Sequence, residues 1–198
     1  SVPEVTISEV TEWLPNAFAF AEKPQPDGTK FILNDAGVRI GFSAITSPTS
    51  DWIIGYSGPT TTLLIFDDSS TCLGARIIKS GDTEDHVAKI VEEPEFLEVY
   101  TGKTWEEITR LRDIDAVTGA TLTSLAVNEG IIYRLAGEGP NLRFPDPITV
   151  KEVQSFFPDA ANLVEVKSSP PMFSVQSDNG SALGWTLNTA HLANRIQG

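Results

Sequence analysis

The sequence has little cysteine and histidine, and these shortages exclude small disulfide-rich proteins and small zinc-binding proteins. Its one cysteine, Cys72, cannot form an internal disulfide, and it lies in the apolar run "TCLGARIIK". We therefore expect a buried structural thiol. The two histidines, His86 and His191, are far apart in the chain and make no zinc-ligand spacing with Cys72. The sequence thus predicts neither a disulfide framework nor a metal site.

Positive charge and long apolar runs are also scarce. The 198 residues hold 14 Lys and Arg against 27 Asp and Glu, a formal net charge of −13. Such a surface repels a phosphate backbone and an anionic membrane face, so we expect no nucleic-acid partner. No apolar run approaches the roughly 18 residues of a membrane span, and no signal peptide is recognised. With 40% hydrophobic residues, the chain can nevertheless build a core.

The chain contains an internal repeat. "VTISEVTEWLPNA" begins at Val5 and "ITVKEVQSFFPDA" at Ile148, an offset of 143 residues, and 12 of 51 gapless pairs are identical. Composition alone gives about 3 identities, so we interpret the similarity as a true repeat. We expect one unit over residues 1–140, a linker rich in Gly and Pro over 141–147, and a truncated second copy over 148–198. The abrupt ends, "SVPEV" and "RIQG", are typical of a piece excised from a longer protein.

Local patterns predict an α+β fold in which helices pack on an antiparallel sheet. Strand pairs are expected around turns at 34–37 and 67–70, and a capped helix is expected to begin at Asp82 or Thr83. Further short helices follow, and a last one runs from about 122 to 135, before Gly137. Strands come first and helices later, without regular βαβ alternation, which favours an antiparallel sheet.

The stretch "DIDAVTGATLTSLAVNEG", residues 113–130, places several small polar groups at the start of this last helix. Ordinary capping needs a single side-chain oxygen, which Thr118 or Thr121 would supply. The glycine between them, Gly119, allows close approach of a bound group, and a helix N-terminus favours an anion such as phosphate. On these residues alone, plain capping and a phosphate-bearing ligand both stay open.

"DAVTGAT" resembles the flavinylation motif Asp-x-x-Ser/Thr-Gly-Ala-Thr of FMN-binding domains. This family includes flavinylated components of the sodium-pumping NADH:quinone oxidoreductase and of the Rnf complex, and extracytoplasmic domains of NosR-like and PceC-like membrane proteins. The resemblance implies that Thr121 carries FMN through a phosphoester bond, which a flavin transferase makes from FAD. Asp115, Thr118, Gly119 and Ala120 match the fixed positions of the motif.

The resemblance covers residues 1–140 and implies further flavin contacts. "GYSGPT", from Gly55, is similar to a Gly-Tyr-x-Gly-Pro segment of the NosR-like branch. "SGDTEDHVAKI" occupies the place of a Glu-Thr-Pro-Gly-Leu-Gly helix, although Glu84, Asp85 and His86 replace Pro-Gly-Leu. Besides the motif, the expected cofactor-binding residues are therefore Tyr56, Ser57, Gly58, Pro59, Thr83, Glu84, Leu122 and Thr123.

Several of the residues near these segments have structural interpretations as well. Tyr56 either stacks on the flavin or anchors the core, and Gly55 and Gly58 are either flavin contacts or turn glycines. We expect His86 to face solvent, with proximity to the flavin as the alternative. The tryptophans that we expect to be packing residues are Trp52 and Trp105.

The resemblance implies an extracytoplasmic redox carrier, not an enzyme that turns over a substrate. Its partners would be a flavin transferase and a membrane redox protein or the iron–sulfur domains of a membrane-anchored parent. A sensory or assembly module of a NosR-like regulator is the alternative. A flavodoxin-like domain is disfavoured, because its phosphate loop follows the first strand of a parallel sheet, whereas "DAVTGAT" comes late in its unit.

Overall fold

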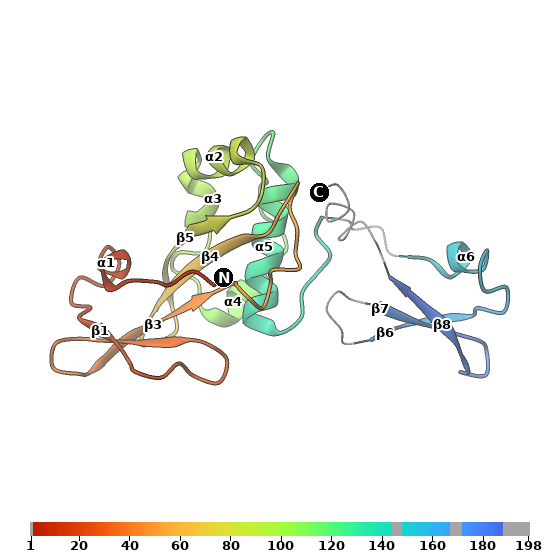
Figure 1. The fold of residues 1–198 in the computed structure, drawn as a ribbon, viewed down its shortest axis with the longest axis horizontal. Coiled ribbons are helices and arrows are strands. Elements are labelled where there is room, and N and C mark those ends of the chain that lie inside the picture. Colours follow the sequence, from red (N-terminus) through yellow and green to blue (C-terminus); the bar gives the residue numbers. More distant parts are fainter. Residues whose placement is uncertain (1, 144–147, 167–171, 188–198) are drawn as a thin grey trace. The chain divides into compact units, whose positions relative to one another are not determined.

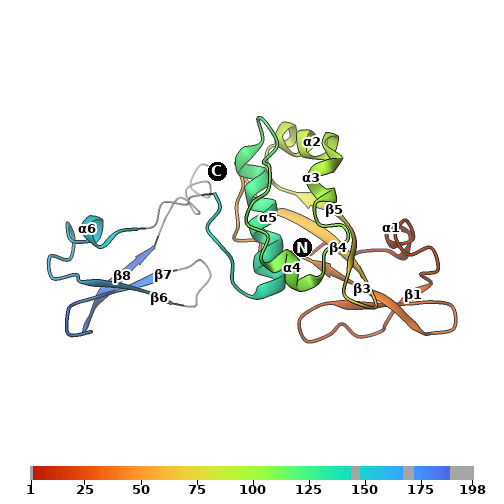
Figure 2. The same cartoon turned by 180° about the vertical axis from the view of Figure 1, so that it is seen from behind.

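The computed structural model describes residues 2–143, 148–166 and 172–187. The chain divides into two compact units, one up to residue 143 and the other from residue 144 onward. The ribbon views in Figure 1 and Figure 2 show helices and a sheet in the first unit and a smaller sheet in the second. Among the described residues, no helix combines the length and the apolar character that a membrane crossing requires.

The first unit is built on a five-stranded antiparallel sheet. Its strands follow the chain order β1-β2-β3-β4-β5, so every neighbouring pair is joined by a direct connection. The α+β fold with an antiparallel sheet, predicted from the sequence, is confirmed. The elements are α1 (Ile7–Val10), β1 (Ala19–Phe20), β2 (Lys30–Leu33), β3 (Arg39–Ile45), β4 (Thr60–Asp67), β5 (Cys72–Ser80), α2 (Glu84–Glu92), α3 (Pro94–Glu98), α4 (Trp105–Thr109) and α5 (Thr121–Ala136).

The two strand turns are formed by the residues that the sequence indicated. The side chain of Asn34 accepts hydrogen bonds from the amides of Ala36 and Val38, at 3.0 and 2.9 Å, and Gly37 takes a positive φ of 75°. Asp67 caps the second turn in the same way, accepting from the amides of Ser69 and Thr71 at 2.9 Å. Such hydrogen bonds from a side chain to the nearby backbone favour a turn within a few residues. This explains why both turns could be predicted from the sequence.

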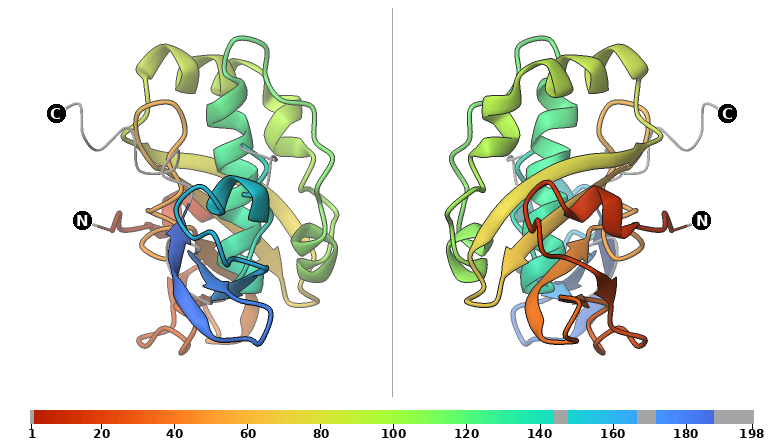
Figure 3. Two further views of the ribbon diagram at one scale, coloured as in Figure 1. Left: turned by 90° about the vertical axis from the view of Figure 1, so that its right-hand side faces the viewer. Right: turned by 90° about the vertical axis from the view of Figure 1, so that its left-hand side faces the viewer.

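Both faces of the five-stranded sheet are covered. On one face, Leu64 and Phe66 of β4 belong to a core cluster that includes Val127 and Ile131 of α5. On the other face, Ile65 of β4 packs in a second cluster with residues of α1. In the right-hand view of Figure 3, α1 lies in front of the sheet and α5 behind it. α5 is therefore the helix that covers one face of the sheet.

The predicted packing residues are found in these layers. Trp105 packs against Phe66 at a ring-centroid distance of 5.3 Å and donates its indole N–H to the carbonyl of Leu135. Trp52 meets the ring of Tyr133 edge-on at 5.1 Å. Cys72 is buried, as predicted, and burial raises the pKa of its thiol to about 11.

The second unit repeats the first part of the first unit, element by element. It comprises α6 (Val150–Val153), β6 (Asn162–Val166), β7 (Met172–Gln176) and β8 (Ala182–Leu187), with sheet order β6-β7-β8. α1 and α6 begin with the same capping box, and a bulge follows Ile32 in β2 and Val175 in β7. Both pairs of elements keep the offset of 143 residues that the sequence identities indicated.

Two glycines at equivalent positions of the copies show why this position of the repeat requires glycine. A Cβ atom on Gly41 of β3 would lie 2.3 Å from the carbonyl oxygen of Phe66 and 2.9 Å from Leu14. A Cβ atom on Gly184 of β8 would lie 2.6 Å from the ring of Phe157, the counterpart of Leu14. In both units, therefore, glycine permits a large apolar side chain to rest directly on the strand backbone.

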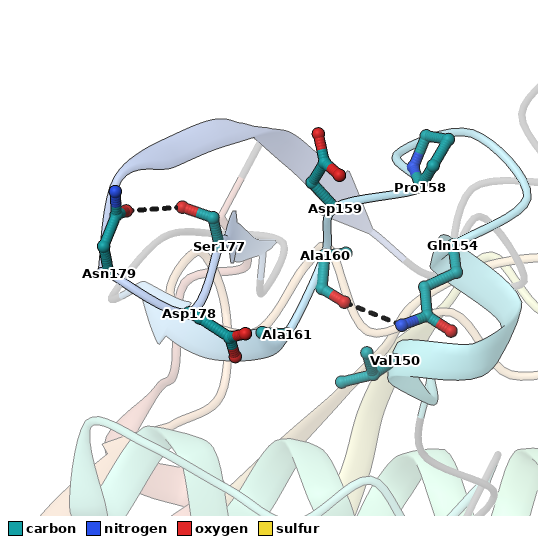
Figure 4. Close-up of a pocket in the computed structure, with 9 residues that line it drawn as sticks. All are labelled: Val150, Gln154, Pro158, Asp159, Ala160, Ala161, Ser177, Asp178 and Asn179. Carbon is teal, nitrogen blue, oxygen red and sulfur yellow. Dashed lines mark hydrogen bonds between the residues drawn. The ribbon is translucent and has the colours of Figure 1, made fainter.

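The repeat also reproduces a shallow polar groove beside the turn that joins the second and third strands of each copy. In the second unit the groove is lined by Gln154, Asp159, Ser177 and Asn179, among others. Figure 4 shows the amide of Gln154 donating to the carbonyl of Ala160, at 2.8 Å, and the hydroxyl of Ser177 donating to Asn179. The corresponding groove of the first unit is lined by Pro15, Asn16, Ala17, Phe18, Asn34 and Asp35.

Candidate functional site

The residues of the predicted motif form the loop that leads into α5. Gly119 has a φ of 76°, and the amide of Ala120 donates to the carbonyl of Val117 at 3.0 Å, which closes a tight turn. The buried hydroxyl of Ser124 accepts from the amide of Val117, at 3.1 Å, and donates to the carbonyl of Ala120, at 3.0 Å. Ser124 thus fixes the loop from inside, and Thr118, Gly119 and Thr121 stay exposed on its outer side.

No threonine caps α5, so the capping interpretation of Thr118 and Thr121 is wrong. The N-cap residue is Ala120, and no side chain within the described residues bonds the first amides of this 16-residue helix. The first amides of a helix point outward and carry partial positive charge. The exposed hydroxyl of Thr121, the first residue of α5, therefore lies at a helix end that favours an anion.

Asp82, which the sequence interpretation treated only as a helix start, organises the neighbouring segments. Its carboxylate accepts from the amides of Tyr56, Ser57 and Thr83, at 2.9, 2.7 and 2.7 Å. It also accepts from the hydroxyl of Ser57, at 3.2 Å, and from that of Thr123, at 2.7 Å. One carboxylate thereby joins the 55–58 loop, the start of α2 and the first turn of α5.

These hydrogen bonds also set the charge of Asp82. Burial raises the pKa of its carboxyl, but the bonds from Thr123, Ser57, Thr83 and Tyr56 lower it further than burial raises it. The net pKa is below the ordinary value. Asp82 is therefore a fixed negative charge at neutral pH, already neutralised in part by its donors.

The two glycines of the 55–58 loop are required by close approach, not by an unusual φ. A Cβ atom on Gly55 would lie 1.9 Å from the Asp82 carboxylate, and one on Gly58 would lie 2.1 Å from the carbonyl oxygen of Gly81. The amide of Gly55 donates to the carbonyl of Gly58 at 3.1 Å, which closes the loop. The glycines thus let the backbone wrap around Asp82.

Tyr56 and His86 form an aromatic pair at this site. Tyr56 is 55% exposed, so it does not anchor the core, and its ring meets that of His86 edge-on at 4.7 Å. His86 does not face solvent as predicted. It is half-buried against Tyr56, and its Nδ1 atom is buried without a hydrogen-bond partner in the described part of the chain. The sequence had no signal for this pairing, because the two residues lie on separate segments.

Two buried polar contacts connect α5 to the segments that precede the 55–58 loop and the motif. Arg143 forms a bidentate ion pair with Glu129 of α5, at 3.0 and 3.1 Å, and its guanidinium also donates to the carbonyl of Ile54. Asn128 of α5 accepts from the hydroxyl of Tyr100 and donates to the carbonyl of Leu111, at 2.9 and 3.0 Å. The first contact supports the base of the 55–58 loop, and the second supports the chain that leads to the motif.

The structure brings most of the predicted residues together at one end of the first unit. Tyr56, Ser57, Thr83 and Thr123 surround Asp82, as described above. Gly58 and Pro59 complete the loop, and the carbonyl of Pro59 accepts from the amide of Gly81 at 2.9 Å. In Figure 1, α2 lies beside the N-terminal end of α5, so the 82–92 segment and the motif are neighbours.

The remaining predicted residues form no hydrogen bond with Asp82 in the described structure. Ala120 is buried and Leu122 is half-buried at the start of α5. Asp115 and Glu84 are exposed, and neither forms an ion pair with any residue that the structure describes. No group of His, Cys, Asp and Glu in the described ranges is arranged to hold a metal ion.

The comparison with known families bears directly on this end of the unit. Residues 55–136 match the family model of the FMN-binding domain. The matched segment begins at the first glycine of the 55–58 loop and ends with the last residue of α5. The matched segment thus contains every element that meets at Asp82. The first copy of the repeat, residues 5–55, ends where this segment begins.

A curated relative supports the same family. The chain is 31% identical, over 119 residues, to one component of the Na(+)-translocating ferredoxin:NAD(+) oxidoreductase complex of Acetobacterium woodii. The alignment covers 56% of this chain and 55% of that protein. The chain therefore spans about half the length of the relative that it matches. The expected resemblance to the FMN-binding domain family is confirmed.

The geometry of residues 55–136 fits a ligand with a phosphate and a flat ring. The uncapped first turn of α5, the exposed Thr121 hydroxyl and the left-handed backbone at Gly119 suit a phosphate. The exposed ring of Tyr56 offers an aromatic surface on a loop that is held to the same helix end through Asp82. Both features belong to the segment that the family match covers.

Proposed function

We propose that Thr121 carries FMN covalently, as a phosphoester, and that the domain transfers electrons within a larger redox protein. The observation that carries this proposal is the position of Thr121. It is the last residue of the family-like motif, it is exposed, and it begins a helix that no side chain caps in the described structure. FMN, when bound, supplies one- and two-electron redox chemistry. The protein supplies attachment, orientation and local charge.

The attachment requires a flavin transferase that uses FAD. The oxygen of Thr121 forms a bond to the phosphorus on the riboflavin side of the pyrophosphate. The bond from that phosphorus to the bridging oxygen breaks, AMP leaves, and the hydroxyl proton is released. Thr123 does not serve as the acceptor in this proposal, because its hydroxyl is buried and donates to Asp82 at 2.7 Å.

We further propose that the domain lies on the extracytoplasmic side of a membrane, in a NosR-like or PceC-like parent. Its electron partner would be a membrane redox protein or an iron–sulfur domain. Similarity to a component of a Na(+)-translocating ferredoxin:NAD(+) oxidoreductase complex supports a role in electron transfer. In the parent protein, a topology reporter fused at the position that corresponds to residue 198 of this chain checks the placement, and a cytoplasmic signal would contradict it.

The decisive experiment is co-expression of the full chain with a flavin transferase, followed by intact-mass measurement and in-gel flavin fluorescence after denaturation. The wild-type chain should gain the mass of one FMN less one water. Thr121→Ala should lose all covalent flavin, whereas Thr123→Ala should keep it. Fluorescence that persists in Thr121→Ala would sink the assignment. A chain that never gains flavin under these conditions would favour the alternative, a sensory or assembly module.

A further inference from the structure

Lys89 lies across the glycine of the motif. Its Nζ atom is 3.4 Å from the carbonyl oxygen of Gly119, and a Cβ atom on Gly119 would lie 2.6 Å from Nζ and 3.6 Å from Cε. The lysine comes from α2 and reaches a residue 30 positions further along the chain. Its ammonium therefore contacts a residue two positions before Thr121, on the exposed side of the loop.

Lys89 has no carboxylate partner among the described residues. With 27 acidic and 14 basic residues, a surface cation meets an excess of carboxylates. Four arginines form ion pairs in the described structure, namely Arg39, Arg76, Arg110 and Arg143. Lys89 forms no ion pair with any described residue, and its ammonium donates to a backbone carbonyl instead. A lysine held beside an uncapped helix start, without a carboxylate, is arranged to receive an anion.

We propose that Lys89 is a specificity-determining residue that binds the phosphate of the flavin, in incoming FAD and in the finished ester on Thr121. This inference rests on the proposed attachment at Thr121. The ammonium attracts the FAD pyrophosphate to the acceptor hydroxyl and offsets the repulsion expected from a strongly acidic surface. After the transfer it neutralises the phosphodiester. Lys89 therefore selects phosphorylated flavins over riboflavin.

A purely structural role for Lys89 makes a different prediction. The residue is also in the last turn of α2, where a cation stabilises the helix dipole. That role would change the unfolding temperature, and it would not distinguish FMN from riboflavin. The test therefore needs a readout that depends on the phosphate of the ligand and not on the fold.

The test compares Lys89→Gln, Lys89→Arg and the control Lys23→Gln, which makes the same charge change in the exposed loop between β1 and β2. In the full chain carrying Thr121→Ala, fluorescence titration gives the Kd for FMN and for riboflavin. Lys89→Gln should weaken FMN binding about tenfold, the loss expected for one charge-assisted bond, and leave riboflavin unchanged. Lys89→Arg should restore FMN binding, and Lys23→Gln should have no effect.

In the chain with Thr121 intact, the initial rate of flavin attachment from FAD supplies a second readout. Lys89→Gln should lower this rate about tenfold at low salt, and the difference should shrink at about 0.5 M salt because exposed charges are screened. Equal rates and equal FMN affinities for Lys89→Gln and wild type would overturn the inference and leave Thr121 attachment standing. A parallel loss of riboflavin binding would show a structural role and overturn it as well. Failure of the wild type to accept flavin would instead reject the proposed function.

Discussion

The hydroxyl of Thr123 donates to the carboxylate of Asp82 at 2.7 Å, and this bond joins α5 to the start of α2. The two residues lie 41 positions apart in the sequence. Because the same carboxylate also accepts from the amides of Tyr56 and Ser57, one side chain holds the 55–58 loop against the N-terminal end of α5. Asp82 is therefore a positioning residue that acts through the backbone of its neighbours.

Replacing Asp82 by Asn should loosen this end of the domain without removing the flavin acceptor. In this variant the side-chain amide offers one acceptor oxygen to donors that now share the two carboxylate oxygens of Asp82. Its NH2 group is itself a donor, so it repels the donors that faced the second oxygen. We expect a loss of about 1–3 kcal/mol in unfolding free energy, measured by urea denaturation. The matched control is Asp85→Asn, at an exposed position of α2, which should cost less than about 0.5 kcal/mol. Equal effects of the two variants would contradict the role of Asp82.

The same contacts predict a dependence of stability on pH. The folded-state pKa of Asp82 is lower than its unfolded value, so its stabilising contribution is present above the unfolded pKa of about 4. That contribution is lost as the pH falls through the lower, folded-state pKa. The difference in unfolding free energy between wild type and Asp82→Asn should therefore be largest near neutral pH and should narrow below about pH 4. A difference that stays constant from neutral pH down to about pH 2.5 would contradict this assignment.

Much of the fold was visible in the sequence because its signals are local. The last helix was expected from about 122 to 135 and runs from Thr121 to Ala136, since a periodic apolar pattern and Gly137 define it. The turns at 34–37 and 67–70 follow from Asn34 and Asp67, which bond amides within four residues. The repeat at an offset of 143 residues is likewise a property of the sequence alone.

The contacts that assemble the site were not visible, because they join distant segments. Lys89 meets Gly119 across 30 residues, and Asp82 meets the 55–58 loop across 25 and 26. A single aspartate before a helix is indistinguishable in sequence from an ordinary cap. The glycines of the loop were the available signal, since their backbone approach to Asp82 leaves no room for a Cβ atom.

The buried ion pair of Glu129 and Arg143 should be costly to break. The two side chains are only 3% and 0% exposed, so Glu129→Gln leaves a guanidinium charge buried without its counter-charge. We expect a loss of about 3–5 kcal/mol in unfolding free energy. Arg110→Ala removes a pair whose side chains are 75% and 71% exposed, and it should cost no more than about 0.5 kcal/mol.

A second readout connects this ion pair to the flavin end. Arg143 also donates to the carbonyl of Ile54, the residue before the 55–58 loop. In Glu129→Gln, the amides of Tyr56 and Ser57 should therefore exchange with deuterium faster than in the wild type. Unchanged exchange at these amides would show that the ion pair stabilises α5 alone.

The thiol of Cys72 should be inert in the folded protein. Burial raises its pKa to about 11, so at about pH 8 roughly one thiol in a thousand is a thiolate, and the side chain is also shielded from reagents. Iodoacetamide should alkylate Cys72 only after denaturation, as followed by intact mass. A variant with Lys23→Cys, at an exposed position, should add one fast-reacting site under the same conditions. Rapid double alkylation of the folded variant would contradict the burial of Cys72.

The final prediction concerns the glycines that the repeat preserves. In Gly41→Ala the new methyl group meets the backbone oxygen of Phe66, which cannot rotate away, and in Gly184→Ala it meets the ring of Phe157. Each change should cost about 1–3 kcal/mol, because overpacking forces neighbouring groups to shift.

Gly130→Ala provides the opposite expectation for the same type of change. Its Cβ atom would lie 3.6 Å from the nearest atom outside its own helix, and alanine is the better helix former by about 0.5–1 kcal/mol. Hydrogen exchange followed by mass spectrometry separates the outcomes by region. Protection should fall around β2–β4 in Gly41→Ala, fall around β7–β8 in Gly184→Ala, and be kept or increased in Gly130→Ala. Gly41 and Gly184 occupy equivalent positions of the two copies. If only one of the two variants lost protection, close packing of a side chain on the strand backbone would be required in one copy and not in the other.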